Sequence, residues 1–359
     1  MKPCKFKFVF LPLSFLIGII EPAQSFELSP LPTKSERFMA KKKYGIKFRT
    51  IFPIVDFGLH TFSSPVHESI TQLGYDCVSS LDDCRDLDLD FANTGVIAGV
   101  RWNDDPPFQF NVGQGRYKDC PNPTQTVSFA LNTRCWVSHF KEISAIADAN
   151  PEAYTSGNGT MLSRTHFGDL QFLHSMATLQ NISPHVTKAK IMMWAEFTWR
   201  VQSGAIDRIP FDTRTGAVLI EGFNEHFPNN EQRTVSDLFT VGRPWLRHQL
   251  ADIAFGSLLH VIEDSFAGGH TDRRESQDNV CNIPEIVEFH TYAGQNKDSH
   301  KEHDGFSQAK NKLIVVEIIK QLVWMRENHA TWSEVKPYLN DCVFRLATDA
   351  RNSSIDVSD

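Results

Sequence analysis

The chain has 359 residues, of which 41% are hydrophobic, and its formal net charge is −7. A chain of this length can form one large domain or two small ones. Its acidic balance disfavours proteins that bind nucleic acid or anionic lipid by bulk electrostatic attraction.

The N-terminus has the features of a secretory signal peptide over residues 1–25. Lysines precede an apolar run, FVFLPLSFLIGII (8–20), and a cleavage site of small residues follows at 23–25. The run is too short for an ordinary membrane span, and no later apolar stretch reaches that length. We therefore expect a secreted, extracellular protein, with passage through a periplasm as one route.

Six cysteines remain after Cys4 is lost with the signal peptide. An even number of cysteines in an exported chain indicates disulfide bonds, although several pairings are open. A thiolate metal site is disfavoured because the chain has no CxxC motif. Pairing by closeness in sequence gives Cys77 with Cys84, Cys120 with Cys135 and Cys281 with Cys342.

The pattern of apolar residues predicts an all-α fold, a single multi-helix domain with long loops. Residues 26–55 form a basic lead segment, residues 56–350 the domain and residues 351–359 a tail. The predicted helices are 64–75, 136–149, 186–205, 243–269, 311–328 and 331–344. Residues 76–125 are predicted loops, and residues 207–235 a hairpin or long loop.

The long predicted helix, 243–269, has its apolar residues from Leu246 to Val261 in one stripe, which predicts one buried face. It ends in the segment HVIEDSFAGGH (260–270), which carries the strongest chemical signal. His260 and Asp264 are four residues apart and project from the same helix face. The Gly-Gly pair after them can end the helix and return His270 to the same region.

This segment predicts a binding site for a divalent metal ion. The neighbours of His260 and Asp264 are apolar, and buried polar groups without partners are destabilising. A structural His–Asp hydrogen bond is the alternative interpretation.

Other imidazole and carboxylate side chains stand in similar surroundings. The candidate metal ligands are His60, His67, Asp104, His166, His260, Asp264, His270, His300 and Asp304. Imidazole with carboxylate suits zinc, whereas calcium and magnesium draw mainly oxygen ligands. These are more ligands than one tetrahedral ion needs. Their number suits three ions that share a bridging carboxylate. The other histidines, including His139, His174 and His226, are interpreted as surface or satisfied core residues.

The motifs and their order resemble the superfamily of zinc-dependent phospholipases C and fungal single-strand nucleases. HVIEDSFAGGH is similar to its HxxxDxxxxxH core. The companion motifs are an early helical histidine at His67, a W-x-D loop at Asp104, the THF element at His166 and a closing HxxxD at His300 and Asp304. Over roughly residues 60–305 the chain looks like the secreted bacterial zinc metallophospholipases C.

The resemblance implies an all-α fold around a cleft with three zinc ions. The implied ligands are Asp104, His166, His260 and Asp264 for one ion, His67 and the bridging Asp264 for a second, and His270, His300 and Asp304 for the third. It also implies hydrolysis of phosphatidylcholine to diacylglycerol and phosphocholine at a membrane surface. The metal would activate the attacking water, which Asp104 would orient or deprotonate.

The chain departs from the family in two places. There, the free N-terminus of the mature protein ligates beside the first histidine, whereas here His67 lies far beyond the cleavage site. His60, or further processing, would complete that zinc site. FAGGH also replaces the usual Q-P-(L/M)-H, which keeps His270 aligned but leaves the substrate open.

Two other functions fit the same residues. One is a single-strand zinc nuclease or 3'-nucleotidase, which the acidic charge disfavours. The other is a non-catalytic exported protein with structural zinc. The number of candidate ligands argues against it, because structural zinc sites are usually closed by about four ligands.

Overall fold

The structure is a computed structural model that describes residues 66–76, 94–110, 120, 125–228, 233–275, 281–292 and 309–355. The described residues are mostly helical and surround one hydrophobic core, as the sequence predicts for a single domain. The predicted signal peptide and lead segment, His60, Cys77, Cys84, His300 and Asp304 lie outside these residues.

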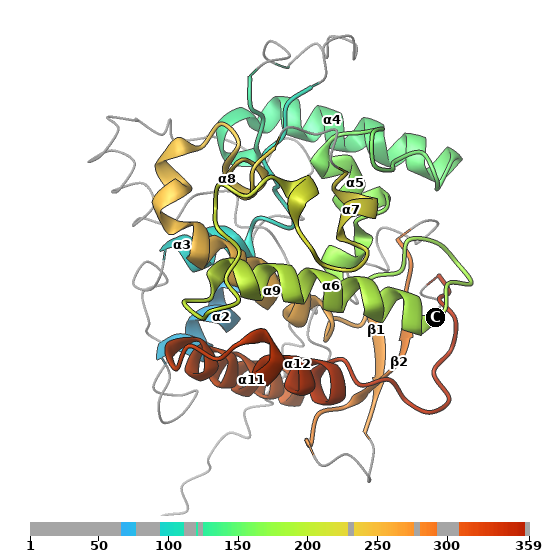
Figure 1. The fold of residues 1–359 in the computed structure, drawn as a ribbon. Coiled ribbons are helices and arrows are strands. Elements are labelled where there is room, and N and C mark those ends of the chain that lie inside the picture. The colour runs from blue at the N-terminus through green and yellow to red at the C-terminus, as the bar shows by residue number, and fades with distance from the viewer. Residues whose placement is uncertain are drawn as a thin grey trace, which may run out of the picture.

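Helix α9 (Leu250–Asp264) passes through the middle of the molecule (Figure 1). Every residue from Ile253 to Asp264 is buried, so the prediction of a single buried stripe was wrong. The reason is that α9 is surrounded: α3 (Thr94–Val100) and α6 (Pro184–Gln202) pack against it, and α2 (Val66–Asp76) and α11 (Ala309–Glu327) also contact it. A helix that is covered on all sides needs no polar face.

Two glycines allow α3 and α9 to approach each other closely. A Cβ atom on Gly256 would lie 2.1 Å from the carbonyl oxygen of Val96, and one on Gly99 would lie 2.1 Å from that of Ile253. No larger residue fits at either position without separating the two backbones. The crossing therefore depends on glycine in both helices.

The loop that follows α3 is fixed to α9 by Asn103, which is fully buried. Its amide nitrogen donates a hydrogen bond to the carbonyl oxygen of Leu173 (2.7 Å). Its amide oxygen accepts one from the hydroxyl of Ser257 (2.6 Å). Ser257 lies one helical turn before His260, so these contacts bring the neighbouring Asp104 to the same stretch of α9.

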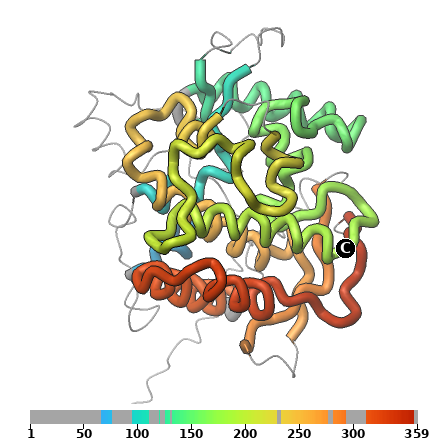
Figure 2. Tube along the Cα trace, viewed as in Figure 1, coloured from blue at the N-terminus to red at the C-terminus, as the bar shows by residue number. Residues whose placement is uncertain are grey.

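Other helices cover this centre. They are α4 (Phe129–Ala149), α5 (Met161–Phe167), α7 (Phe223–His226), α8 (Val235–Thr240) and α12 (Trp332–Tyr338), with 3-10 turns η4 (Gln171–His174), η5 (Thr215–Ala217) and η6 (Pro244–Gln249) and the π-helical turn η7 (Leu339–Val343). Figure 2 shows the segment after α6 looping between α6 and α4. Residues 207–235 form no hairpin where they are described, and only an isolated bridge pairs Arg214 with Thr234.

The all-α prediction was wrong in one respect, because the chain forms a small antiparallel sheet after α9. Strand β1 (Thr271–Arg274) pairs with β2 (Glu285–Phe289), with a bulge between Asp272 and Arg273. The bonded ladder continues where the backbone N–H of His290 donates to the carbonyl oxygen of His270 (2.8 Å). The sheet thus holds the residue at which the chain turns back from α9.

Two disulfides are present among the described residues, Cys120–Cys135 and Cys281–Cys342, with Cα–Cα distances of 4.5 and 5.6 Å. Both pairings agree with the sequence prediction. Disulfides are typical of proteins in oxidising compartments. In the part of the chain that the structure describes, no helix combines the length and apolarity needed to span a bilayer.

The close crossing of α3 and α9 predicts a large effect of one added methyl group. Gly256→Ala should lower the free energy of unfolding by about 3 kcal/mol, because the new Cβ meets backbone rather than a movable side chain. Gly204→Ala is the control, since its Cβ meets only the ring of His329, at 3.0 Å; its effect should stay within about 1 kcal/mol. Urea unfolding followed by circular dichroism measures both, and equal losses would contradict the prediction.

Candidate metal centre

The carboxylate of Asp264, at the end of α9, is surrounded by imidazoles. Its Oδ2 lies 2.9 Å from Nδ1 of His174 and 2.9 Å from Nε2 of His260. Its Oδ1 lies 3.3 Å from Nε2 of His67, and Nδ1 of His270 is 3.6 Å from Oδ2. One buried carboxylate thus contacts histidines from α2, η4, α9 itself and the turn before β1.

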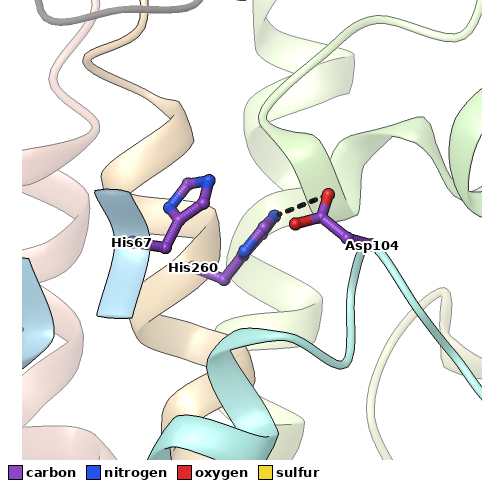
Figure 3. Close-up of side chains that lie close together, drawn as sticks. All are labelled: His67, Asp104 and His260. Carbon is purple, nitrogen blue, oxygen red and sulfur yellow. Dashed lines mark ion pairs between the residues drawn. The ribbon is translucent and has the colours of Figure 1, made fainter. Parts of the chain in front are cut away.

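A second carboxylate, that of Asp104, approaches from the loop after α3. Its Oδ1 lies 3.6 Å from Nδ1 of His174 and 3.7 Å from Nε2 of His260. Figure 3 shows His260 between Asp104 and His67. The Asp104 side chain is 17% exposed, against 1% for Asp264. Burial raises the pKa of the Asp104 carboxyl to about 7, although the charge of His260 opposes this.

The next residue, Asp105, points elsewhere. Its Oδ1 accepts a hydrogen bond from the backbone N–H of Phe129 (2.8 Å), and its Oδ2 accepts one from the guanidinium of Arg243 (3.2 Å). It therefore ties the loop to α4 and to the chain before η6. Of the two adjacent aspartates, only Asp104 faces the imidazoles.

His166, on α5, completes the cluster. Its ring centroid lies 4.9 Å from that of His174. Its Nδ1 lies 3.1 Å from the carbonyl oxygen of Leu162 and 3.0 Å from the hydroxyl of Thr165. Because these contacts engage Nδ1, Nε2 is the nitrogen that a metal ion would use.

Among the residues that the structure describes, six side chains have ligand atoms close enough together to hold metal. They form three overlapping groups, in each of which the atoms lie within 4.8 Å of one another: His67–Asp104–His260, Asp104–His166–His174 and His174–His260–Asp264. Four imidazoles with two carboxylates make a donor set that suits zinc. These buried groups can hold metal ions.

The charges of the cluster also suit a cation. Burial lowers the pKa of His67, His166 and His174, which keeps these imidazoles in the neutral form that binds metal. Burial opposes protonation of His260 as well, but the nearby carboxylates, Asp264 first, outweigh it and raise its pKa to about 10. A bound divalent cation would supply the positive charge that this proton provides, so the residues fit a metal in charge as well as in geometry.

His174 was not among the sequence candidates, and it was interpreted as a surface or satisfied core residue. It is 6% exposed and belongs to two of the three groups. It ends the 3-10 turn η4, and the following Ser175 has a left-handed backbone (φ 52°). Such a turn has no helical periodicity, so the only signal in the sequence was a second histidine soon after His166.

The predicted ligands His67, Asp104, His166, His260 and Asp264 all meet in this cluster. His270 lies beside it and in none of the three groups. Its Nδ1 donates a hydrogen bond to the carbonyl oxygen of His174 (2.7 Å). The other predicted ligands of its zinc ion, and His60, lie outside the described residues, so the predicted third ion stays a prediction.

No known family model matches the chain, and neither the curated proteins nor the solved structures contain a significant match. The resemblance to zinc-dependent phospholipases C therefore rests on the motifs and their order in the sequence. It stays a prediction.

The position of His174 predicts that it is needed for metal binding. His174→Ala should weaken zinc binding by about 100-fold, because the variant removes a ligand from two groups. His139→Ala is the control: this histidine is also buried, but it bonds to Thr160 outside the cluster (3.0 Å). Competition with a chromophoric chelator measures the affinities. Wild-type affinity in His174→Ala would show that His174 is not a ligand.

Proposed function

We propose that this protein is a secreted zinc-dependent phosphodiester hydrolase of the phospholipase C type, which hydrolyses phosphatidylcholine to diacylglycerol and phosphocholine. The proposal rests on the observation that predicted metal ligands from separate segments lie together. Five ligand positions named by the order of the motifs come from four separate segments into one buried cluster: His67, Asp104, His166, His260 and Asp264. Structural zinc sites are usually closed by about four ligands, whereas this cluster has six side chains and a carboxylate that solvent reaches.

In this proposal the described ligands would hold two zinc ions. The groups His67–Asp104–His260 and Asp104–His166–His174 have only Asp104 in common. Asp104 would therefore contribute to both groups. The resemblance implies Asp264 as the bridge, and its Oδ1 lies 3.3 Å from Nε2 of His67 while its Oδ2 lies 2.9 Å from Nδ1 of His174.

A third zinc ion is part of the proposal. It would use His270, which lies beside the cluster, together with His300 and Asp304.

The residues have distinct parts in the proposed reaction. Bound zinc would neutralise the phosphate oxygens and lower the pKa of a water molecule. Asp104, the more exposed carboxylate, orients that water and accepts its proton. The oxygen of the water bonds to phosphorus, the bond from phosphorus to the glycerol oxygen breaks, and diacylglycerol leaves as the alcohol after taking up a proton. Phosphocholine keeps the new oxygen.

The zinc-loaded protein should release phosphocholine from phosphatidylcholine vesicles, lose this activity with a chelator and regain it with zinc. Asp104→Asn should lower kcat by roughly 1,000-fold, because the amide cannot accept the proton. Asp105→Asn is the matched control from the same loop, and it should keep most of the activity since Asp105 bonds to Phe129 and Arg243. Zinc content is measured for each variant.

Single-stranded DNA is the competing substrate. Cleavage of DNA without release of phosphocholine would replace the phospholipase by a nuclease. If the zinc-loaded protein turns over neither substrate, both enzymatic functions fail.

A further inference from the structure

Glu263 precedes Asp264 in α9, and its side chain is fully buried where α9 meets α2. Its Oε2 lies at hydrogen-bond distance from Nδ1 of His67 (2.7 Å), and its Oε1 accepts a hydrogen bond from the hydroxyl of Thr71 (2.7 Å). Both oxygens are thus engaged, and Glu263 belongs to none of the three metal-binding groups. It is placed to act on the centre through His67 rather than as a ligand.

The two partners of Glu263 lie on one face of α2. His67 and Thr71 are four residues apart, so both side chains reach the same carboxylate. Two hydrogen bonds fix the direction of the carboxylate, and through it the plane of the imidazole. The opposite nitrogen of that ring, Nε2, lies 3.3 Å from Oδ1 of Asp264, and the ring lies 4.3 Å from the ring of His260 between centroids (Figure 3).

We propose that Glu263 is a positioning residue of the metal centre, which holds His67 with its proton on Nδ1 and its Nε2 directed at the ion. The inference rests on the metal centre of the proposed function. A carboxylate that accepts a hydrogen bond from a ligating imidazole fixes its tautomer and raises its basicity. Loss of such a partner typically weakens metal binding by about 10–100-fold.

Asp169 provides a matched carboxylate outside the cluster. Its Oδ2 pairs with Nδ1 of His226 at 2.9 Å, and Arg164 donates to both of its oxygens. The pair is partly buried, whereas that of Glu263 and His67 is fully buried, and it belongs to no metal-binding group. It separates loss of positioning from the general cost of breaking a His–carboxylate pair.

The test compares zinc affinity and the visible spectrum of bound Co²⁺ in four variants. Glu263→Ala should weaken zinc binding by about 10–100-fold and change the Co²⁺ spectrum, since the His67 ring is released. Glu263→Gln should restore the spectrum and much of the affinity, because its amide oxygen still accepts from His67. Thr71→Val should cause a smaller loss in the same direction. Asp169→Asn should change neither affinity nor spectrum.

The outcomes separate this inference from the proposed function. If the wild type binds both metals and Glu263→Ala does so with the same affinity and spectrum, the positioning role is wrong and the metal centre stands. An equal loss of zinc affinity in Asp169→Asn would also overturn the positioning role of Glu263. If Glu263→Ala does not fold, Thr71→Val replaces it in the test. An unchanged zinc affinity in Thr71→Val would then show that the positioning role is wrong. A wild type that binds neither metal refutes the metal centre, and the positioning role with it.

Discussion

A buried carboxylate requires compensation, and Asp264 is the place where this structure meets that requirement. An uncompensated charge in an apolar interior is strongly destabilising. Four imidazoles lie within 3.6 Å of the two oxygens of Asp264. Because they come from α2, η4, α9 and the turn before β1, four separate parts of the chain have to meet at the end of one helix.

The architecture follows from bringing these parts together. Helix α9 is buried on every side, so it presents Ser257, His260, Glu263 and Asp264 to different neighbours. Glycines at the crossing with α3 bring the Asp104 loop within reach, and the small sheet returns His270 to the same end of the helix. The departures from a simple amphipathic bundle, a fully buried helix and a two-stranded sheet, both lie next to the metal-binding groups.

The candidate ligands are held in place by hydrogen bonds to neighbouring residues. Nδ1 of His166 contacts the carbonyl of Leu162 and the hydroxyl of Thr165, and Nδ1 of His67 bonds to Glu263. Such contacts select the tautomer of each imidazole before a metal arrives, which reduces the cost of binding. Asp104 is more exposed than Asp264, and the proposed hydrolase function depends on this exposure.

The sequence by itself determined what depends on local spacing. The pairing of His260 with Asp264 was predictable because residues four apart share a helix face, and Cys120–Cys135 because the two residues are close in the chain. Tertiary structure decided the rest. The W-x-D motif names Asp104, but packing between segments distant in sequence turns it, and not Asp105, toward the imidazoles. The inclusion of His174 depends on an irregular turn, and the contact of Glu263 with His67 joins residues of two different helices. No periodicity along one segment encodes such contacts, since they arise only when separate elements pack together.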